Sequence, residues 1–130
     1  MRIFLDSCII IYLVEQPAGF FPAVVNWLKA NPGDLLSNEL ARMESLVIPV
    51  RTGNAALVKD FEDFFRMRVV QLGSLDRPVL DRAVPIRANV PKIKTPDAIH
   101  LASAVELGCD VLLTNDPDMK LFTGIRVELI

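Results

Sequence analysis

Short apolar runs alternate with amphipathic segments along the whole chain. The apolar runs predict strands at 3–5, 35–36, 67–72 and 111–113, and a last short strand at 126–130 on a sheet edge. Helical spacing of apolar residues predicts helices at 7–14, from Pro22 to about 30, after Ser37 or Asn38, at 54–65, at 76–88 and from Thr95 to Gly108. Strands that alternate with helices predict an α/β fold, with a mostly parallel central sheet of four to five short strands and helices on both faces. The chain, 1–130, fits a single domain.

Three places complicate the element boundaries. The isoleucines at 9–11 are β-branched and favour a strand locally, although Asp6 and Ser7 can cap a helix there. Pro49 is expected to interrupt the helix that begins near Asn38, because proline cannot donate a helical hydrogen bond. For the same reason Pro85 is expected to disturb the helix at 76–88.

A helix and the strand that follows it bring two acids to comparable positions. Thr95 is expected at the N-cap, Pro96 at the first helical position and Asp97 in the first turn. Asp116 follows the strand at 111–113. Ligands of open parallel sheets bind at the carboxyl ends of the strands, so this unit indicates a functional site.

Composition and charge narrow the function classes. The longest apolar run, Cys8 to Val14, is far below the roughly 18 residues of a membrane span, and no signal peptide is recognisable. A cytoplasmic protein without membrane contact is therefore expected, with Cys8 and Cys109 as reduced thiols. The net charge of -2 argues against a general nucleic-acid binder. Residues 66–94, however, hold seven basic side chains against two acidic ones, which suits a polyanion beside a cation, or simply a solvated surface.

Four acids occupy similar places in the predicted fold: Asp6, Glu44, Asp97 and Asp116. Each alone is explained by a helix cap, a turn or solvated surface. Together they are expected at one edge of a parallel sheet, where two carboxylates about 4 Å apart repel by about 4 kcal/mol at an effective dielectric near 20. A bound cation relieves that repulsion. Oxygen ligands without a second histidine or paired cysteines favour Mg²⁺ or Mn²⁺ over zinc.

Four segments resemble the conserved blocks of PIN domains, and most closely those of single-domain VapC-type toxins. They are residues 3–7 (IFLDS), 37–44 (SNELARME), 95–102 (TPDAIHLA) and 113–116 (LTND). The resemblance implies a PIN-like three-layer sandwich and a ribonuclease that uses one or two Mg²⁺ or Mn²⁺ ions. It also implies a homodimer that a cognate VapB-type antitoxin silences by occupying the active-site groove.

The resemblance also assigns roles to single residues. Asp6, Glu44, Asp97 and Asp116 match the metal-binding acids, and the polar residues that support them match Ser7, Thr114 and Asn115. Secondary candidates are Asp118, His100 and Glu39. Glu39 lies five positions before Glu44, about 140° around a helix, so only one of these two glutamates can point into a given site.

The expected reaction is endonucleolytic hydrolysis of RNA phosphodiester bonds by a metal-activated water. Two alternatives stay open. A small α/β phosphohydrolase usually needs a second acid two residues after the first-strand Asp, and position 8 is Cys. A catalytically inactive PIN-like module that binds RNA or protein is the other alternative. The phenylalanines at 20, 21, 61, 64 and 65 leave room for a partner surface, although core packing explains most of them.

Overall fold

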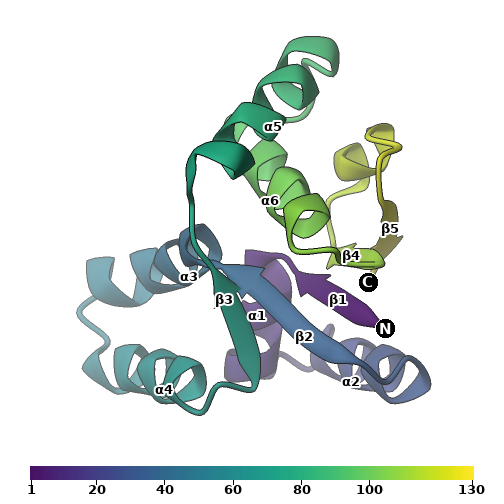
Figure 1. Cartoon of the computed structure of the whole chain (residues 1–130). Coiled ribbons are helices and arrows are strands. Elements are labelled where there is room, and N and C mark those ends of the chain that lie inside the picture. Colours follow the sequence, from purple (N-terminus) through teal and green to yellow (C-terminus); the bar gives the residue numbers. More distant parts are fainter.

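The computed structural model describes residues 1–130 and contains one five-stranded sheet. The strands are β1 (Arg2–Leu5), β2 (Asp34–Asn38), β3 (Val70–Gly73), β4 (Val111–Thr114) and β5 (Arg126–Leu129). The helices are α1 (Ser7–Glu15), α2 (Phe21–Ala30), α3 (Glu39–Arg51), α4 (Ala55–Arg66), α5 (Arg77–Asn89), α6 (Thr95–Glu106) and the short 3-10 helix η1 (Pro117–Leu121). All strands are parallel, in the order β3-β2-β1-β4-β5 (Figure 1). The predicted α/β fold is confirmed, and β5 lies at an edge as expected.

Alternate residues of the central strand β1 face two different helix layers. Phe4 packs in a cluster with residues of α5 and α6, whereas Ile3 and Leu5 pack with residues of α1 to α4. All three side chains are fully buried. A strand covered on both faces reads as a continuous apolar run, which is why the alternating pattern of a half-exposed strand is missing here. Figure 1 shows α5 and α6 on the opposite side of the sheet from α1 and α2.

The β-branched isoleucines directly after β1 form a helix despite their local preference for a strand. Asp6 caps α1 through its side chain, and Ile9 and Ile10 are buried on the inner face of the helix. Burial of a large apolar side chain contributes about 1.5 to 3 kcal/mol, which exceeds the small helix penalty of a β-branched residue. The expected helix at 7–14 is therefore confirmed.

Two prolines do not break their helices. α3 continues through Pro49 to Arg51, so the expected interruption at Pro49 is wrong. Only the last two residues of the helix follow Pro49, which is buried, and the hydroxyl of Thr52 donates to the carbonyl of Ile48 at 2.9 Å. α5 likewise contains Pro85 and continues to Asn89.

Two element boundaries in the structure differ from those predicted, the start of β3 and the N-cap of α6. The third strand begins at Val70 rather than Met67, because Met67 is the C-cap of α4 and Arg68 adopts a left-handed conformation with φ of 53°. Thr95 is not the N-cap of α6. Lys94 holds that position with an extended backbone and no side-chain cap. None of the helices has the length and apolarity that a bilayer crossing requires.

Candidate active site

Two neighbouring strands deliver the first pair of acids. β1 and β4 are parallel partners, with Leu5 opposite Leu113, so the residues after them leave the sheet at the same edge. Asp6 is the N-cap of α1, where its Oδ1 accepts the backbone N–H of Ser7 at 2.7 Å. Asp116 is the N-cap of η1. Both carboxylates are thus placed by backbone geometry close to strand ends.

Thr114 connects these two acids. Its hydroxyl donates to Asp6 Oδ2 at 2.6 Å and accepts the backbone N–H of Asp116 at 3.1 Å. The hydroxyl of Ser7 lies 3.5 Å from Asp6 Oδ1. Asp6 is only 6% exposed, so these donors supply the hydrogen bonds that water would otherwise give. The structure thus places two of the expected supporting residues in contact with Asp6.

α3 and α6 deliver the other two acids. The side chain of Asn38 caps α3, accepting the backbone N–H of Ala41 at 2.9 Å, and donates to the hydroxyl of Ser103 on α6 at 2.8 Å. This buried contact holds the start of α3 against α6. Glu44 extends from α3, and Asp97 lies in the first turn of α6.

His100 lies one helical turn after Asp97 and is fully buried. Its Nε2 is 2.5 Å from Glu44 Oε1 and 3.7 Å from Asp6 Oδ1, whereas its Nδ1 has no hydrogen-bond partner. Burial works to lower the pKa of this imidazole. The hydrogen bond to Glu44 and the charges of Asp6, Glu44 and Asp97 outweigh burial and raise that pKa above its usual value. His100 therefore joins two of the acids through one ring nitrogen.

The carboxyl group of Asp97 responds to the other three acids. Burial, together with the negative charges of Asp6, Asp116 and Glu44, raises the pKa of Asp97 from 3.8 to about 6, against the opposing effect of His100. Only charges that lie near one another can act on one group in this way. The four acids that are distant in the sequence therefore share one electrostatic environment.

The sequence matches the model of the PIN domain family over residues 3–124. This chain belongs to the PIN domain family. The match covers nearly the whole chain and includes all four acids. No curated protein matches the sequence.

Several solved structures share the fold of this PIN domain. VapBC2 from Rickettsia felis, bound to a DNA fragment from its promoter, has a TM-score of 0.77 and 14% identity, covering 99% of this chain and 98% of that one. A toxin-antitoxin complex from Klebsiella pneumoniae has a TM-score of 0.71 and 23% identity, covering 96% and 94%. VapC20 from Mycobacterium tuberculosis, a sarcin-ricin loop cleaving toxin, has a TM-score of 0.72 and 16% identity, covering 95% and 98%. At these identities the likeness establishes the fold alone.

The donor chemistry of the site suits a hard divalent cation, because the converging groups are carboxylates. The raised pKa of Asp97 reports negative charge that a cation would neutralise. As the side chains stand, no group of three His, Cys, Asp or Glu residues is arranged to hold an ion. Glu44 is engaged by His100 and Asp6 by Thr114. Binding of an ion by these acids would therefore require side-chain rotations, with Glu44 turning away from His100.

The secondary candidates differ in their positions. Glu39 is exposed in the first turn of α3 and makes no hydrogen bond or ion pair, whereas Glu44, half-buried on the same helix, contacts the site. Asp118 donates its backbone N–H to Asp116 Oδ1 at 2.9 Å, and its carboxylate faces solvent 3.7 Å from Lys92. Asn115 donates its side-chain amide to the hydroxyl of Tyr12.

Sequence reasoning missed Tyr12 as part of this region. It named Asn38 as a possible cap of α3, which the structure confirms, but not as a contact of α6. Tyr12 is the only tyrosine of the chain and lies four residues after Cys8, hence on the same face of α1. That spacing was the available signal. Cys8 lies 3.9 Å from both Asp6 Oδ2 and Thr114 Oγ1, and burial and the charge of Asp6 raise the pKa of its thiol to about 12. Both cysteines are free, as expected, and Cys8 stays a neutral thiol.

Proposed function

We propose that this PIN domain is an Mg²⁺- or Mn²⁺-dependent endoribonuclease and the toxin of a VapBC-type toxin-antitoxin pair. The observation that carries the proposal is the convergence of the acids. His100 contacts both Glu44 and Asp6, and Thr114 connects Asp6 to the backbone of Asp116. The negative charges of all three raise the pKa of Asp97. The family membership and the fold shared with toxins such as VapC20 support the same reading.

In this proposal Asp6 and Asp97 are the central ligands of one or two divalent ions, and Glu44 and Asp116 complete the site. A bound ion supplies Lewis acidity, which activates water for in-line attack on the phosphodiester and neutralises charge on the phosphate. Thr114 and Ser7 hold the Asp6 carboxylate in place through their hydrogen bonds. His100 orients Glu44 through its Nε2, which also lies 3.7 Å from Asp6 Oδ1.

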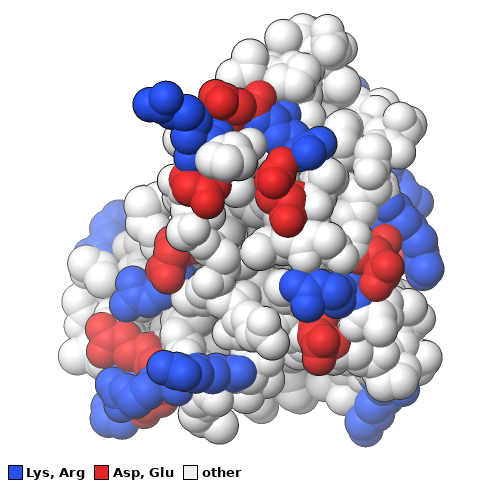
Figure 2. Space-filling view, in the orientation of Figure 1, with Lys and Arg blue, Asp and Glu red and all other residues white.

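RNA is the proposed substrate because basic side chains lie close to the acidic site. Lys94 is the N-cap of the helix that carries Asp97, and Lys92 lies 3.7 Å from Asp118. On the face that Figure 2 shows, Lys and Arg side chains are interspersed with Asp and Glu side chains, so the bases that argue for RNA are Lys92 and Lys94. A phosphate backbone is attracted by these bases while its scissile phosphate approaches the metal-filled acids.

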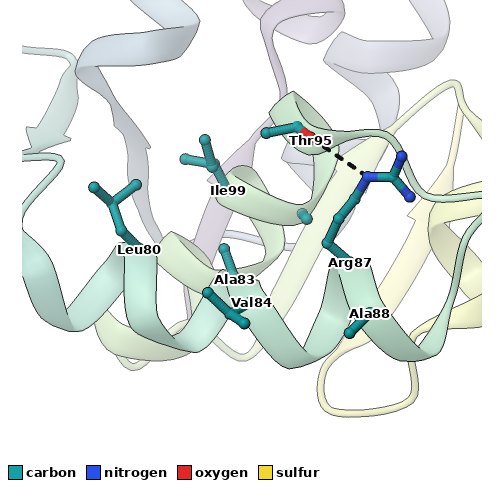
Figure 3. A pocket seen from close by; sticks show the side chains of 8 residues that line it. Leu80, Ala83, Val84, Arg87, Ala88, Thr95 and Ile99 are labelled. Carbon is teal, nitrogen blue, oxygen red and sulfur yellow. Dashed lines mark hydrogen bonds between the residues drawn. The ribbon is translucent and has the colours of Figure 1, made fainter.

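A homodimer is proposed through an apolar groove of about 360 Å³ between α5 and α6 (Figure 3). Its apolar lining consists of Leu80, Ala83, Val84, Ala88, Ala98 and Ile99. Two of these residues, Leu80 and Val84, are 43% and 64% exposed. Contiguous exposed apolar side chains mark protein contact surfaces. Arg87 and Thr95 form one end of the groove, 3.4 Å apart. Thr95 and Asp97 both belong to the first turn of α6, so a second copy seated here would contact the end of the helix that carries Asp97, on the side away from its carboxylate.

A second apolar surface on α3 is proposed to bind the antitoxin. It comprises the exposed Met43, Val47, Ile48 and Val50. Met43 is next to Glu44, so a segment that covers this surface reaches the active site with little further length. The solved toxin-antitoxin complexes that share this fold support an antitoxin as the partner.

The decisive experiment incubates the purified protein with a panel of structured RNAs in Mg²⁺, in Mn²⁺ and in EDTA. We expect metal-dependent cleavage that falls at least about a hundredfold in Asp6→Asn and in Glu44→Gln. Matched controls are Asp60→Asn, an exposed acid on α4, and Glu39→Gln on α3, and both should cleave as the parent does. Equal cleavage by Asp6→Asn and the parent would refute the proposal. Binding without cleavage in every divalent ion would favour an inactive binding module instead.

A further inference from the structure

Two aromatic rings form a parallel stack beside the acids. Tyr12 extends from α1, and Phe20 stands directly before α2. Their ring centroids are 4.5 Å apart and the ring planes differ by only 3°. This is face-to-face geometry, whereas the Phe64–Phe65 pair on α4 is edge-to-face, at 80°.

The stack is connected to the candidate active site by two contacts. The hydroxyl of Tyr12 accepts a hydrogen bond from the side-chain amide of Asn115, the residue between Thr114 and Asp116. Cys8, one helical turn before Tyr12, lies 3.9 Å from both Asp6 and Thr114. Helical side chains lean toward the helix N-terminus, and the N-terminus of α1 is at Asp6, so the Tyr12 ring leans toward the acids.

The Tyr12 ring of the stack packs against the core, whereas the Phe20 ring is exposed to solvent. Tyr12 is half-buried and packs at the margin of the α1 to α4 core cluster. Phe20 belongs to neither core cluster and is 43% exposed. Its one aromatic contact is the stack on Tyr12. A core role explains Tyr12 but leaves the exposure of Phe20 unexplained.

We propose that Tyr12 and Phe20 form a stacking subsite for one unpaired nucleobase next to the scissile phosphate. This inference rests on the proposed nuclease function. A nucleobase is flat and extends a parallel aromatic stack, and every base offers a face for such a contact. Paired bases are stacked on their neighbours and cannot reach an aromatic ring in this way, so the subsite excludes duplex RNA.

The test uses a short single-stranded oligoribonucleotide with a central 2-aminopurine, and the same strand annealed to its complement. Both are titrated into the protein in an Asp97→Asn background with Mg²⁺, so that cleavage does not interfere. We expect stacking to quench the fluorescence of the single strand. Phe20→Leu should weaken its binding about tenfold and abolish the quenching, and Phe20→Trp should restore both. Binding of the duplex should be weaker and the same in all variants.

Control variants separate the stack from general apolar packing. Phe65→Leu removes a ring that packs against Phe64, Arg42 and the α1 to α4 core cluster, and it should bind the single strand as the background protein does. Tyr12→Phe keeps both rings and loses only the bond to Asn115, so quenching should remain. Unchanged binding and quenching in Phe20→Leu would overturn the proposal. So would equal loss of single-strand and duplex binding.

The outcome is distinguishable from failure of the proposed function. If the parent protein cleaves RNA in Mg²⁺ but Phe20→Leu cleaves paired and unpaired sites with unchanged KM, the subsite is refuted and the nuclease stands. If no RNA is cleaved and quenching still depends on Phe20, the nuclease is refuted and a base-binding surface stands. Loss of antitoxin binding in Phe20→Leu, with RNA binding intact, would assign the stack to the protein partner and overturn the proposal.

Discussion

At Asp97, burial and three neighbouring carboxylates oppose ionisation, and His100 favours it. The folded state therefore holds the proton of this group more tightly than the unfolded chain does. Because the pKa is raised in the folded state, the ionised carboxylate lowers the free energy of unfolding above about pH 6 and has no such effect below about pH 4. The like charges around Asp97 therefore lower the free energy of unfolding of the metal-free protein.

We expect Asp97→Asn to stabilise the metal-free protein. Each pKa unit corresponds to about 1.4 kcal/mol, and solvent screening at this partly exposed group reduces the effect. The free energy of unfolding in EDTA should therefore rise by about 1 to 2 kcal/mol at pH 8, and the gain should shrink as the pH falls through 6 toward 4. Urea denaturation at several pH values measures it. A parent protein as stable as the variant at pH 8 would show that the acids do not interact.

Among the elements, helices α3 and α5 each combine a buried face with an exposed apolar one. On α5, Val79, Ala83 and Ile86 face the core, while Leu80 and Val84 lie exposed along the groove to α6. On α3, Ala41 and Ser45 are buried and Val47 is exposed. The hydrophobic pattern alone does not separate these two roles, since both faces carry similar residues.

Charged substitutions on the two exposed faces should separate the two proposed partners. Val84→Glu, in the α5–α6 groove, should convert the dimer to a monomer without changing the folded content. Val47→Glu, on α3, should leave the dimer intact and weaken binding of the cognate antitoxin at least about tenfold, since an interface charge must be desolvated. Light scattering with size exclusion and titration with the purified antitoxin measure the two effects. A parent protein that is monomeric would refute the dimer, and the reverse pattern would exchange the two surfaces.

At the scale of the whole molecule, the site joins four separate parts of the chain. Its acids follow β1, lie on α3, begin α6 and follow β4. A ligand that binds these groups only in the folded state stabilises the entire sheet and both helix layers, because unfolding releases it.

Mg²⁺ or Mn²⁺ should therefore raise the melting temperature of the parent protein. At an ion concentration about a hundredfold above Kd, the gain is about 2.7 kcal/mol, or on the order of 10 °C for a domain of this size. The increase should be lost in Asp6→Asn and kept in Asp60→Asn. Differential scanning calorimetry with and without the ions measures it. An equal increase in both variants would mean that the ions bind elsewhere.

The order and type of the main elements followed from local signals. Asp6, Asn38 and Asp76 each cap the helix that follows, and the fully buried strands read as continuous apolar runs. Local rules failed where the tertiary context outweighed them. Pro49, itself buried, is accommodated two residues before the end of α3, and the left-handed turn at Arg68 delays β3. Neither could be anticipated from single-residue preferences.

By itself, the sequence determined that this protein has a parallel α/β sheet and that three of the four acids follow strands or begin a helix. Periodicity and capping act over a few residues, so they are readable along the chain. Only the tertiary structure decided which side chains meet. The contact of His100 with Glu44, the hydrogen bond of Asn115 with Tyr12, the stack of Tyr12 on Phe20 and the raised pKa of Asp97 all depend on packing. The partners in two of these contacts are 56 and 103 residues apart, a separation at which no local pattern specifies distance.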